Sequence, residues 1–115
     1  MQLLTQCQTF DLLQNGKANK ASHGASDFKP VVKLFTPWAG ATWLLSELDP
    51  DDQDIAFGLC DLGQGTPEIG YVSLAELRSL RGPGGLTVER DLWFKADKTI
   101  QAYADEARAR GCIAA

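Results

Sequence analysis

The feature that most limits what this chain can fold into is a succession of four short apolar runs between Val31 and Leu74. The runs are rich in β-branched and aromatic residues, which favour strands. The breaks between them contain Gly, Pro and Asp, which favour tight turns. Short strands joined by short turns predict an antiparallel meander. The four runs read VVKLFT, ATWLLSEL, DIAFGLCDL and EIGYVSL.

The third run is apolar on both sides. Successive side chains of a strand point to opposite faces, so in the second run Trp43 and Leu45 share one face, while the other carries Thr42, Leu44 and Ser46. In the third run, Phe57 and Leu59 share one face and Ala56 lies on the other. We therefore expect the third run to form a central strand that is covered on two sides by helices.

Helices are predicted at the beginning of the chain and after the fourth run. Apolar residues at helical spacing predict a helix over about residues 3–14, which Gly16 would end. A second, short helix should begin at Ser73, in a capping box with Glu76. Gly82 should end this short helix in the left-handed conformation.

The last part of the chain predicts a strand and a helix. Residues 86–94 alternate between apolar and polar side chains, with Arg90 as an exception on the apolar face. A C-terminal helix should follow, with Asp97 as its N-cap and Gly111 at its end. Residues 17–29 lack large apolar side chains and predict a flexible loop.

Together these elements predict one α+β domain over residues 1–115. It contains an antiparallel sheet of four to five strands, an N-terminal helix, a short capped helix and a C-terminal helix. A net charge of -4 makes direct binding of nucleic acid unlikely, because such binding needs Lys and Arg to replace phosphate counterions.

The cysteines indicate a reduced protein. Cys7, Cys60 and Cys112 are odd in number and widely spaced, which fits neither a disulfide framework nor a zinc site. The N-terminus lacks the pattern of a secretory signal, and no apolar stretch is long enough to span a membrane. We expect a cytoplasmic protein without a cofactor or a bound metal.

The most unusual local feature is the acidic stretch ELDPDDQD, over residues 47–54. A calcium loop needs a glycine and a distant glutamate at set spacing, and neither is in place. A solvated turn between two strands is the simplest interpretation. The interval between Lys33 and Arg78 has no basic residue, however, so it could also form an acidic face that binds a basic partner. The candidate contact residues are Asp49, Asp51, Asp52, Asp54 and Glu68.

The sequence contains no convincing set of catalytic residues. Cys60 has apolar and acidic neighbours, which favour the unreactive thiol, and the single histidine, His23, lies far away in the predicted loop. A small enzyme or ligand binder would have to use a pocket around Arg90 and Cys60, with Glu89 and Asp91. A structural ion pair is the simpler role for Arg90.

A third possibility is a DNA-associated regulator. Arg78 and Arg81, near the end of the short helix, would then contact phosphates. Such a protein would bind DNA with a steep dependence on salt concentration.

Three segments of the chain form a recognisable combination: VVKLFTP, ATWLLSELDPDDQDIAFGLCDLG and PEIGYVSLAELRSLRGPGGLTVERDLWFK. Together with the closing helix, they resemble a bacterial family known as domain of unknown function 2958. The resemblance extends from about Val32 to the C-terminal helix. It implies an accessory protein of plasmids, integrative elements or prophages, often encoded near antirestriction and plasmid-maintenance genes, and it assigns no catalytic residue.

These observations lead to one functional hypothesis. We expect a non-enzymatic accessory protein of mobile genetic elements that binds a host or element-encoded protein through an acidic face. Anti-restriction and anti-CRISPR activity are the roles that the family context suggests.

Overall fold

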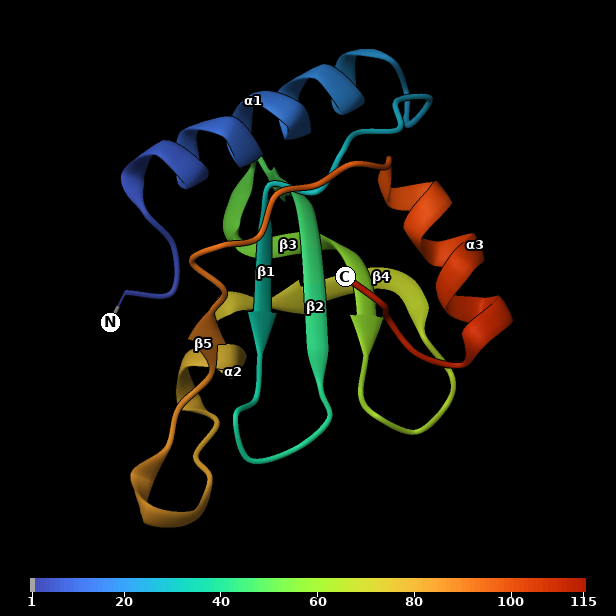
Figure 1. Ribbon diagram of the computed structural model, residues 1–115. Coiled ribbons are helices and arrows are strands. Elements are labelled where there is room, and N and C mark those ends of the chain that lie inside the picture. Colours follow the sequence, from blue (N-terminus) through green and yellow to red (C-terminus); the bar gives the residue numbers. More distant parts are fainter. Residues whose placement is uncertain (1) are drawn as a thin grey trace.

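The computed structural model describes residues 2–115 and contains one sheet in which every neighbouring pair of strands is antiparallel (Figure 1). The five strands follow the order β4-β3-β2-β1-β5. The first four strands therefore form the predicted meander, and β5 adds to the β1 edge. The strands are β1 (Val32–Phe35), β2 (Thr42–Asp49), β3 (Asp52–Asp61), β4 (Glu68–Ser73) and β5 (Glu89–Arg90).

Three helices cover the two faces of the sheet. On one face, Leu12 of α1 (Gln6–Ala21) and Leu77 of α2 (Leu74–Ser79) pack into one core with Trp43 and Leu45 of β2. This confirms that Trp43 and Leu45 share a face.

On the opposite face, α3 (Ile100–Arg110) packs against the middle of the sheet. Tyr103 and Ala104 of this helix form a second core with Leu44 of β2 and Leu59 of β3. The sheet is thus covered on both sides, as the two apolar faces of the third run predict. The fold is α+β.

Helix α1 is displaced from its predicted range. It begins at a capping box in which the Gln8 N–H donates to Thr5 Oγ1 and the Thr5 N–H donates to Gln8 Oε1, both at 3.0 Å. It also continues through Gly16, which was expected to end it. A Cβ atom at Gly16 would lie 1.8 Å from the Leu48 carbonyl oxygen, so this glycine lets the helix backbone contact the sheet.

Residues 17–21, expected in a flexible loop, are therefore helical. The segment that follows is attached to the N-terminal end of α3. The Ile100 N–H donates to the Phe28 carbonyl oxygen at 2.7 Å, and the Gln101 N–H donates to Asp27 Oδ1 at 3.1 Å. These bonds give the segment a defined path between the two helices.

The predicted strand over residues 86–94 is much shorter than expected, since only Glu89 and Arg90 pair with β1. The Trp93 N–H donates to Asp91 Oδ1 at 2.9 Å, which turns the chain away from the sheet. Leu92 and Trp93 consequently project into solvent, with Trp93 92% exposed.

Two predicted helix ends were also wrong. Thr99, not Asp97, is the N-cap of α3, because its hydroxyl accepts the Ala102 N–H at 3.3 Å. Helix α2 ends at Ser79 with Leu80 as its C-cap, and Gly82 has φ -104°, outside the left-handed region. Gly111 does adopt the left-handed conformation at the end of α3, with φ 82°.

Candidate functional site

The acidic stretch forms the turn between β2 and β3, and most of its carboxylates have partners within the chain. Asp51 forms an ion pair with Lys20 at the end of α1. Asp49 Oδ1 accepts the Asp51 N–H at 2.8 Å, and Asp52 Oδ1 accepts the Asp54 N–H at 3.2 Å. These short-range bonds are typical of a tight turn.

Asp54 serves as an additional cap for helix α2. The Ser73 hydroxyl donates to Asp54 Oδ2 at 2.5 Å, and the Ala75 N–H donates to Asp54 Oδ1 at 2.9 Å. The bond from Ser73 is the main reason that the pKa of Asp54 lies below its usual 3.8. Half of the predicted capping box is present, since the Ser73 hydroxyl accepts the Glu76 N–H at 3.3 Å. In the described chain, the Glu76 side chain does not bond back to Ser73, and the second capping bond of α2 is the one from the Ala75 N–H to Asp54.

Glu68 lies far from the other candidate contact residues. It pairs with Cys60 near the end of β3, whereas Asp52 begins that strand. At a rise of about 3.3 Å per residue, the two ends are roughly 26 Å apart. The five residues predicted to form one acidic face therefore do not lie together.

The structure instead places one carboxylate beside two aromatic rings. Glu47 of β2 pairs with Phe57 of β3, and Phe57 pairs with Tyr71 of β4, so the three form a row across the sheet. The Phe57 and Tyr71 ring centroids are 5.1 Å apart. Tyr71 is 72% exposed, so much of its ring is open to solvent.

Glu47 is oriented by a β-bulge in β2. The register shifts between Leu45 and Glu47, which leaves Ser46 as the extra residue. The Asn15 side-chain amide donates to the Ser46 carbonyl oxygen at 2.9 Å. Without the bulge, Glu47 would share a face with Leu45, beneath α1; with it, Glu47 shares a face with Phe57.

The row opens into a pocket of about 240 Å³, which the end of α1 and the β2–β3 turn also line. We call it the acidic–aromatic pocket and define it by Glu47, Asp49, Phe57 and Tyr71. Lys20 is the one cation among its lining residues within the described chain, and Lys20 is paired with Asp51. The pocket is thus suited to a positively charged group.

The Glu47 carboxyl group has an unusual environment. Glu47 is only 9% exposed, and burial is the main reason that the pKa of its carboxyl group lies above the usual 4.5. Asp49 raises the pKa further, whereas the Asn19 amide, which donates to Glu47 Oε1 at 2.8 Å, opposes the shift. A perturbed carboxyl group in a pocket is a common property of functional sites.

The residues of the enzyme hypothesis do not converge. Within residues 2–115, Arg90 donates to the Gln2 carbonyl oxygen at 2.8 Å and does not form the expected ion pair, while Asp91 pairs with Lys33 at 3.6 Å. Two strands separate Arg90 from Cys60, a distance of about 14 Å at usual strand spacing. Burial raises the pKa of the Cys60 thiol, which disfavours the reactive thiolate.

Two further findings concern the described residues. Residues 2–115 contain no group of three or more His, Cys, Asp or Glu side chains arranged to hold a metal ion. Within the same residues, no helix is both long and apolar enough to cross a membrane.

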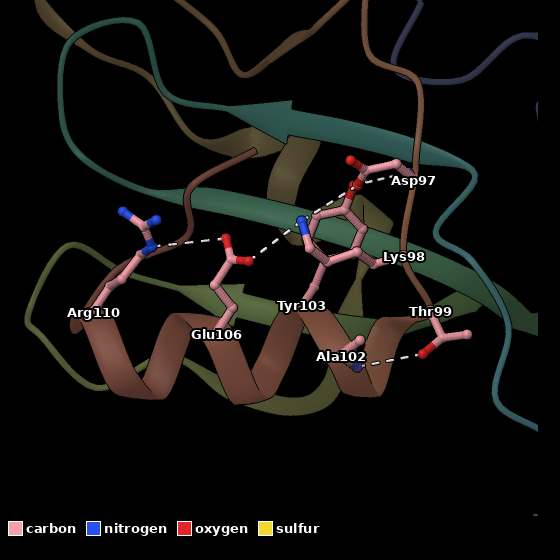
Figure 2. A network of polar contacts seen from close by, with 7 residues as sticks. All are labelled: Asp97, Lys98, Thr99, Ala102, Tyr103, Glu106 and Arg110. Carbon is pink, nitrogen blue, oxygen red and sulfur yellow. Dashed lines mark hydrogen bonds and ion pairs between the residues drawn. The ribbon is translucent and has the colours of Figure 1, made fainter.

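Apart from the acidic–aromatic pocket, ionisable groups also cluster in a polar network at α3 (Figure 2). The Tyr103 hydroxyl donates to Asp97 Oδ1 at 2.8 Å and accepts the Asp97 N–H at 3.1 Å. Lys98 lies over the Tyr103 ring and pairs with Asp97 and Glu106, while Arg110 also pairs with Glu106. Burial raises the pKa of Tyr103, and the Tyr103 hydroxyl lowers that of Asp97. These groups satisfy one another, so we interpret the network as an anchor for the segment before α3.

Comparison with known proteins gives one match. A family model described as "Protein of unknown function (DUF2958)" matches residues 3–114, nearly the whole chain. No curated protein and no solved structure matches the chain.

Proposed function

The chain belongs to the DUF2958 family, and we propose that it acts by binding another protein through the acidic–aromatic pocket. The partner would insert a Lys or Arg side chain between the carboxylates and the Tyr71 ring. In keeping with the family resemblance, we propose a host or element-encoded protein as the partner and an accessory role in mobile genetic elements. Anti-restriction and anti-CRISPR activity are specific forms of that role.

The observation that carries this proposal is the exposed Tyr71 ring in the same pocket as the buried Glu47 carboxyl group. A cation over an aromatic face gains about 0.5–1 kcal/mol at an exposed site and about 2 kcal/mol when desolvated. Phe57 supports the Tyr71 ring from β3. An aromatic ring beside a carboxylate is a favourable environment for a guanidinium or ammonium group.

The raised pKa of Glu47 gives the proposal a measurable signature. A bound cation would favour the ionised carboxylate and so lower this pKa. Binding would release a proton near the raised pKa, and affinity would increase as the pH rises through that range. An interaction that does not involve Glu47 would lack this pH dependence.

The direct test is a titration of the ¹⁵N-labelled protein with short amidated peptides, followed by NMR. The peptides carry a single Arg, Lys or Gln between glycines. We expect the Arg and Lys peptides to shift the amide signals of Phe57 and Tyr71 and the Gln peptide to shift neither. Equal shifts from all three peptides would contradict the proposal.

A matched pair of variants tests the role of the pocket carboxylates. Glu47→Gln combined with Asp49→Asn should weaken binding of the Arg peptide about tenfold or more, by analogy with charged pairs at interfaces. The control, Asp52→Asn, removes a carboxylate from the same turn but outside the pocket lining, and should retain most of the affinity. The same proteins can be compared by affinity capture from a host lysate. If the pocket variant and the wild type recover the same partners equally, the pocket is not the binding site.

A further inference from the structure

We infer that a second pocket, formed by Arg78, Arg81 and Thr87, binds an oxyanion carried on an apolar body. The oxyanion is a carboxylate or a phosphate. The pocket has a volume of about 580 Å³, within the range typical of small-molecule sites. We call it the arginine pocket. Leu3, Leu4, Leu77 and Val88 also line it.

The arginine pocket contains hydrogen-bond donors that the described chain leaves free. The Arg78 guanidinium group has no hydrogen bond or ion pair within residues 2–115, and the Thr87 hydroxyl has no partner there either. Arg81 uses Nη1 for the carbonyl oxygens of Arg78, at 2.5 Å, and Leu80, at 2.9 Å. Its Nε and Nη2 groups remain available. Guanidinium groups bind carboxylates and phosphates through such paired donors.

No carboxylate lines the arginine pocket in the described chain. Arg78 contributes to the lowered pKa of Asp54, after the hydrogen bonds from Ser73 and Ala75. Asp54 already accepts bonds from Ser73 and Ala75, so it does not neutralise Arg78 directly. An anion in the pocket would therefore meet a positive local potential, despite the net charge of -4 on the chain.

The remaining lining residues select the kind of anion. Leu3, Leu4, Leu77 and Val88 are all at least nine-tenths buried and belong to the core beneath α1 and α2. Arg90 holds the N-terminal segment beside them through its bond to the Gln2 carbonyl oxygen. The small apolar areas that these side chains leave exposed form the floor of the pocket beside the arginines, which favours an organic anion over inorganic phosphate.

Nucleic acid fits this pocket less well. Duplex DNA is held by many phosphate contacts along an extended basic surface. Here two arginines lie over an apolar floor, and Glu76 is exposed on the same short helix. A small oxyanion satisfies the two guanidinium groups without bringing further phosphates toward acidic residues.

The test is an NMR titration of the ¹⁵N-labelled full chain at constant ionic strength with hexanoate, phenyl phosphate, inorganic phosphate and a short DNA duplex. We expect saturable shifts of the Leu77, Thr87 and Val88 amides with hexanoate or phenyl phosphate. The stronger of these two ligands identifies the source of the oxyanion. The absence of saturable shifts with both would overturn the inference, and so would tighter binding of the duplex through the same amides.

Variants identify the residues responsible. Arg78→Gln combined with Arg81→Gln should weaken binding of the organic anion about tenfold or more, because charge-assisted bonds are the stronger ones. Arg108→Gln, which removes an exposed arginine from α3, is the matched control and should bind like the wild type. Thr87→Val preserves the shape of the residue and should weaken binding by about threefold to tenfold through loss of one hydrogen bond. Unchanged affinity in both the double arginine variant and Thr87→Val would overturn the inference.

Discussion

The acidic–aromatic pocket and the arginine pocket carry opposite charges and are built in opposite ways. In the first, the carboxyl group of Glu47 is buried and the Tyr71 ring is exposed. In the second, the side chains of Arg78 and Arg81 are exposed and the apolar residues are buried. A net charge of -4 therefore conceals two local environments of different sign, and it says little about which charged groups either one binds.

The two pockets also differ in what holds their walls in place. The end of α1 reaches the acidic–aromatic pocket because Gly16 lets backbone contact backbone at Leu48. Near the arginine pocket, Gly82 packs against the side chain of Trp38, and its N–H donates to the Leu86 carbonyl oxygen at 2.8 Å. The Gly82–Leu86 bond closes a turn, and the residues on either side of that turn, Arg81 and Thr87, both line the arginine pocket. A side chain can adjust to a new atom more easily than a backbone can.

The largest effect should follow from Gly16→Ala. The new Cβ would overlap the Leu48 carbonyl oxygen, so α1 would have to move away from the sheet. We expect the free energy of unfolding to fall by about 3 kcal/mol or more, at the upper end of overpacking effects. Urea denaturation measures this change. A loss below about 1 kcal/mol would show that α1 is not held by this close contact.

Gly82→Ala should have a smaller and more local effect. Its Cβ would lie 2.2 Å from Trp38 Cδ2, and φ -104° is accessible to alanine, so the indole ring has to shift. We expect a loss of about 1–2 kcal/mol in the free energy of unfolding. NMR shifts should be confined to the arginine pocket. Equal losses for both glycine variants would remove the proposed difference between the two pockets.

Tyr71→Ala tests whether the exposed ring contributes to recognition. We expect the affinity for the Arg peptide to fall about tenfold, in line with a cation–π contact of about 1 kcal/mol or more together with lost contact area. Tyr71→Phe keeps the ring and should bind nearly as well as the wild type. If the alanine variant binds as tightly as the phenylalanine variant, the ring is not part of the site.

Glu47→Gln should change how stability depends on pH. Because burial raises the pKa of Glu47, the folded state holds the proton more tightly than the unfolded state. This residue's contribution to stability therefore decreases as the pH rises from about its usual 4.5 through the raised value. The variant should lack this decrease and gain at most about 1 kcal/mol near pH 7, since the Asn19 hydrogen bond offsets part of the burial cost.

Urea denaturation of both proteins between pH 4 and 8 provides the comparison. The difference in the free energy of unfolding between the two proteins reports on Glu47 alone, because Asp54 is present in both. The lowered pKa of Asp54 has the opposite effect, since the stabilisation by Asp54 is lost as the pH falls. A constant difference across this range would show that Glu47 titrates normally.

The smallest effect is expected for Lys20→Met. This change frees Asp51 at the edge of the acidic–aromatic pocket and removes its one lining cation in the described chain. Affinity for the Arg peptide should increase about twofold to threefold at low salt, and the gain should shrink at high salt because exposed charges are screened. A decrease in affinity would mean that Lys20 helps to form the pocket.

Local sequence patterns predicted much of the fold. The four apolar runs form β1 to β4. The third run has two apolar faces, and the strand that it forms, β3, is covered on both faces. The C-terminal helix is also present, and Ile100, Tyr103, Ala104 and Ala107, which have helical spacing, form its buried stripe. The start of α1 could also have been found, since Thr5 and Gln8 have the spacing of a capping box.

The candidate site was much less predictable. The acidic stretch was recognised as a turn, but its residues could not be assigned to partners. Asp51 pairs with a helix residue more than thirty positions earlier, and Asp54 caps a helix that begins about twenty positions later. The residues that line the acidic–aromatic pocket come from α1, β2, β3 and β4 and from the segments that follow α1 and β2. No local pattern connects them.

Features that depend on neighbouring residues follow from the sequence alone, namely strand periodicity, turns and the apolar faces of strands and helices. Which polar side chains meet, by contrast, depends on the folded chain. The bulge at Ser46 places Glu47 on the face of Phe57 and Tyr71, and the backbone contact at Gly16 carries α1 past its expected end. Both depend on contacts between segments distant in sequence, and a shift of one residue in a strand moves a side chain to the opposite face.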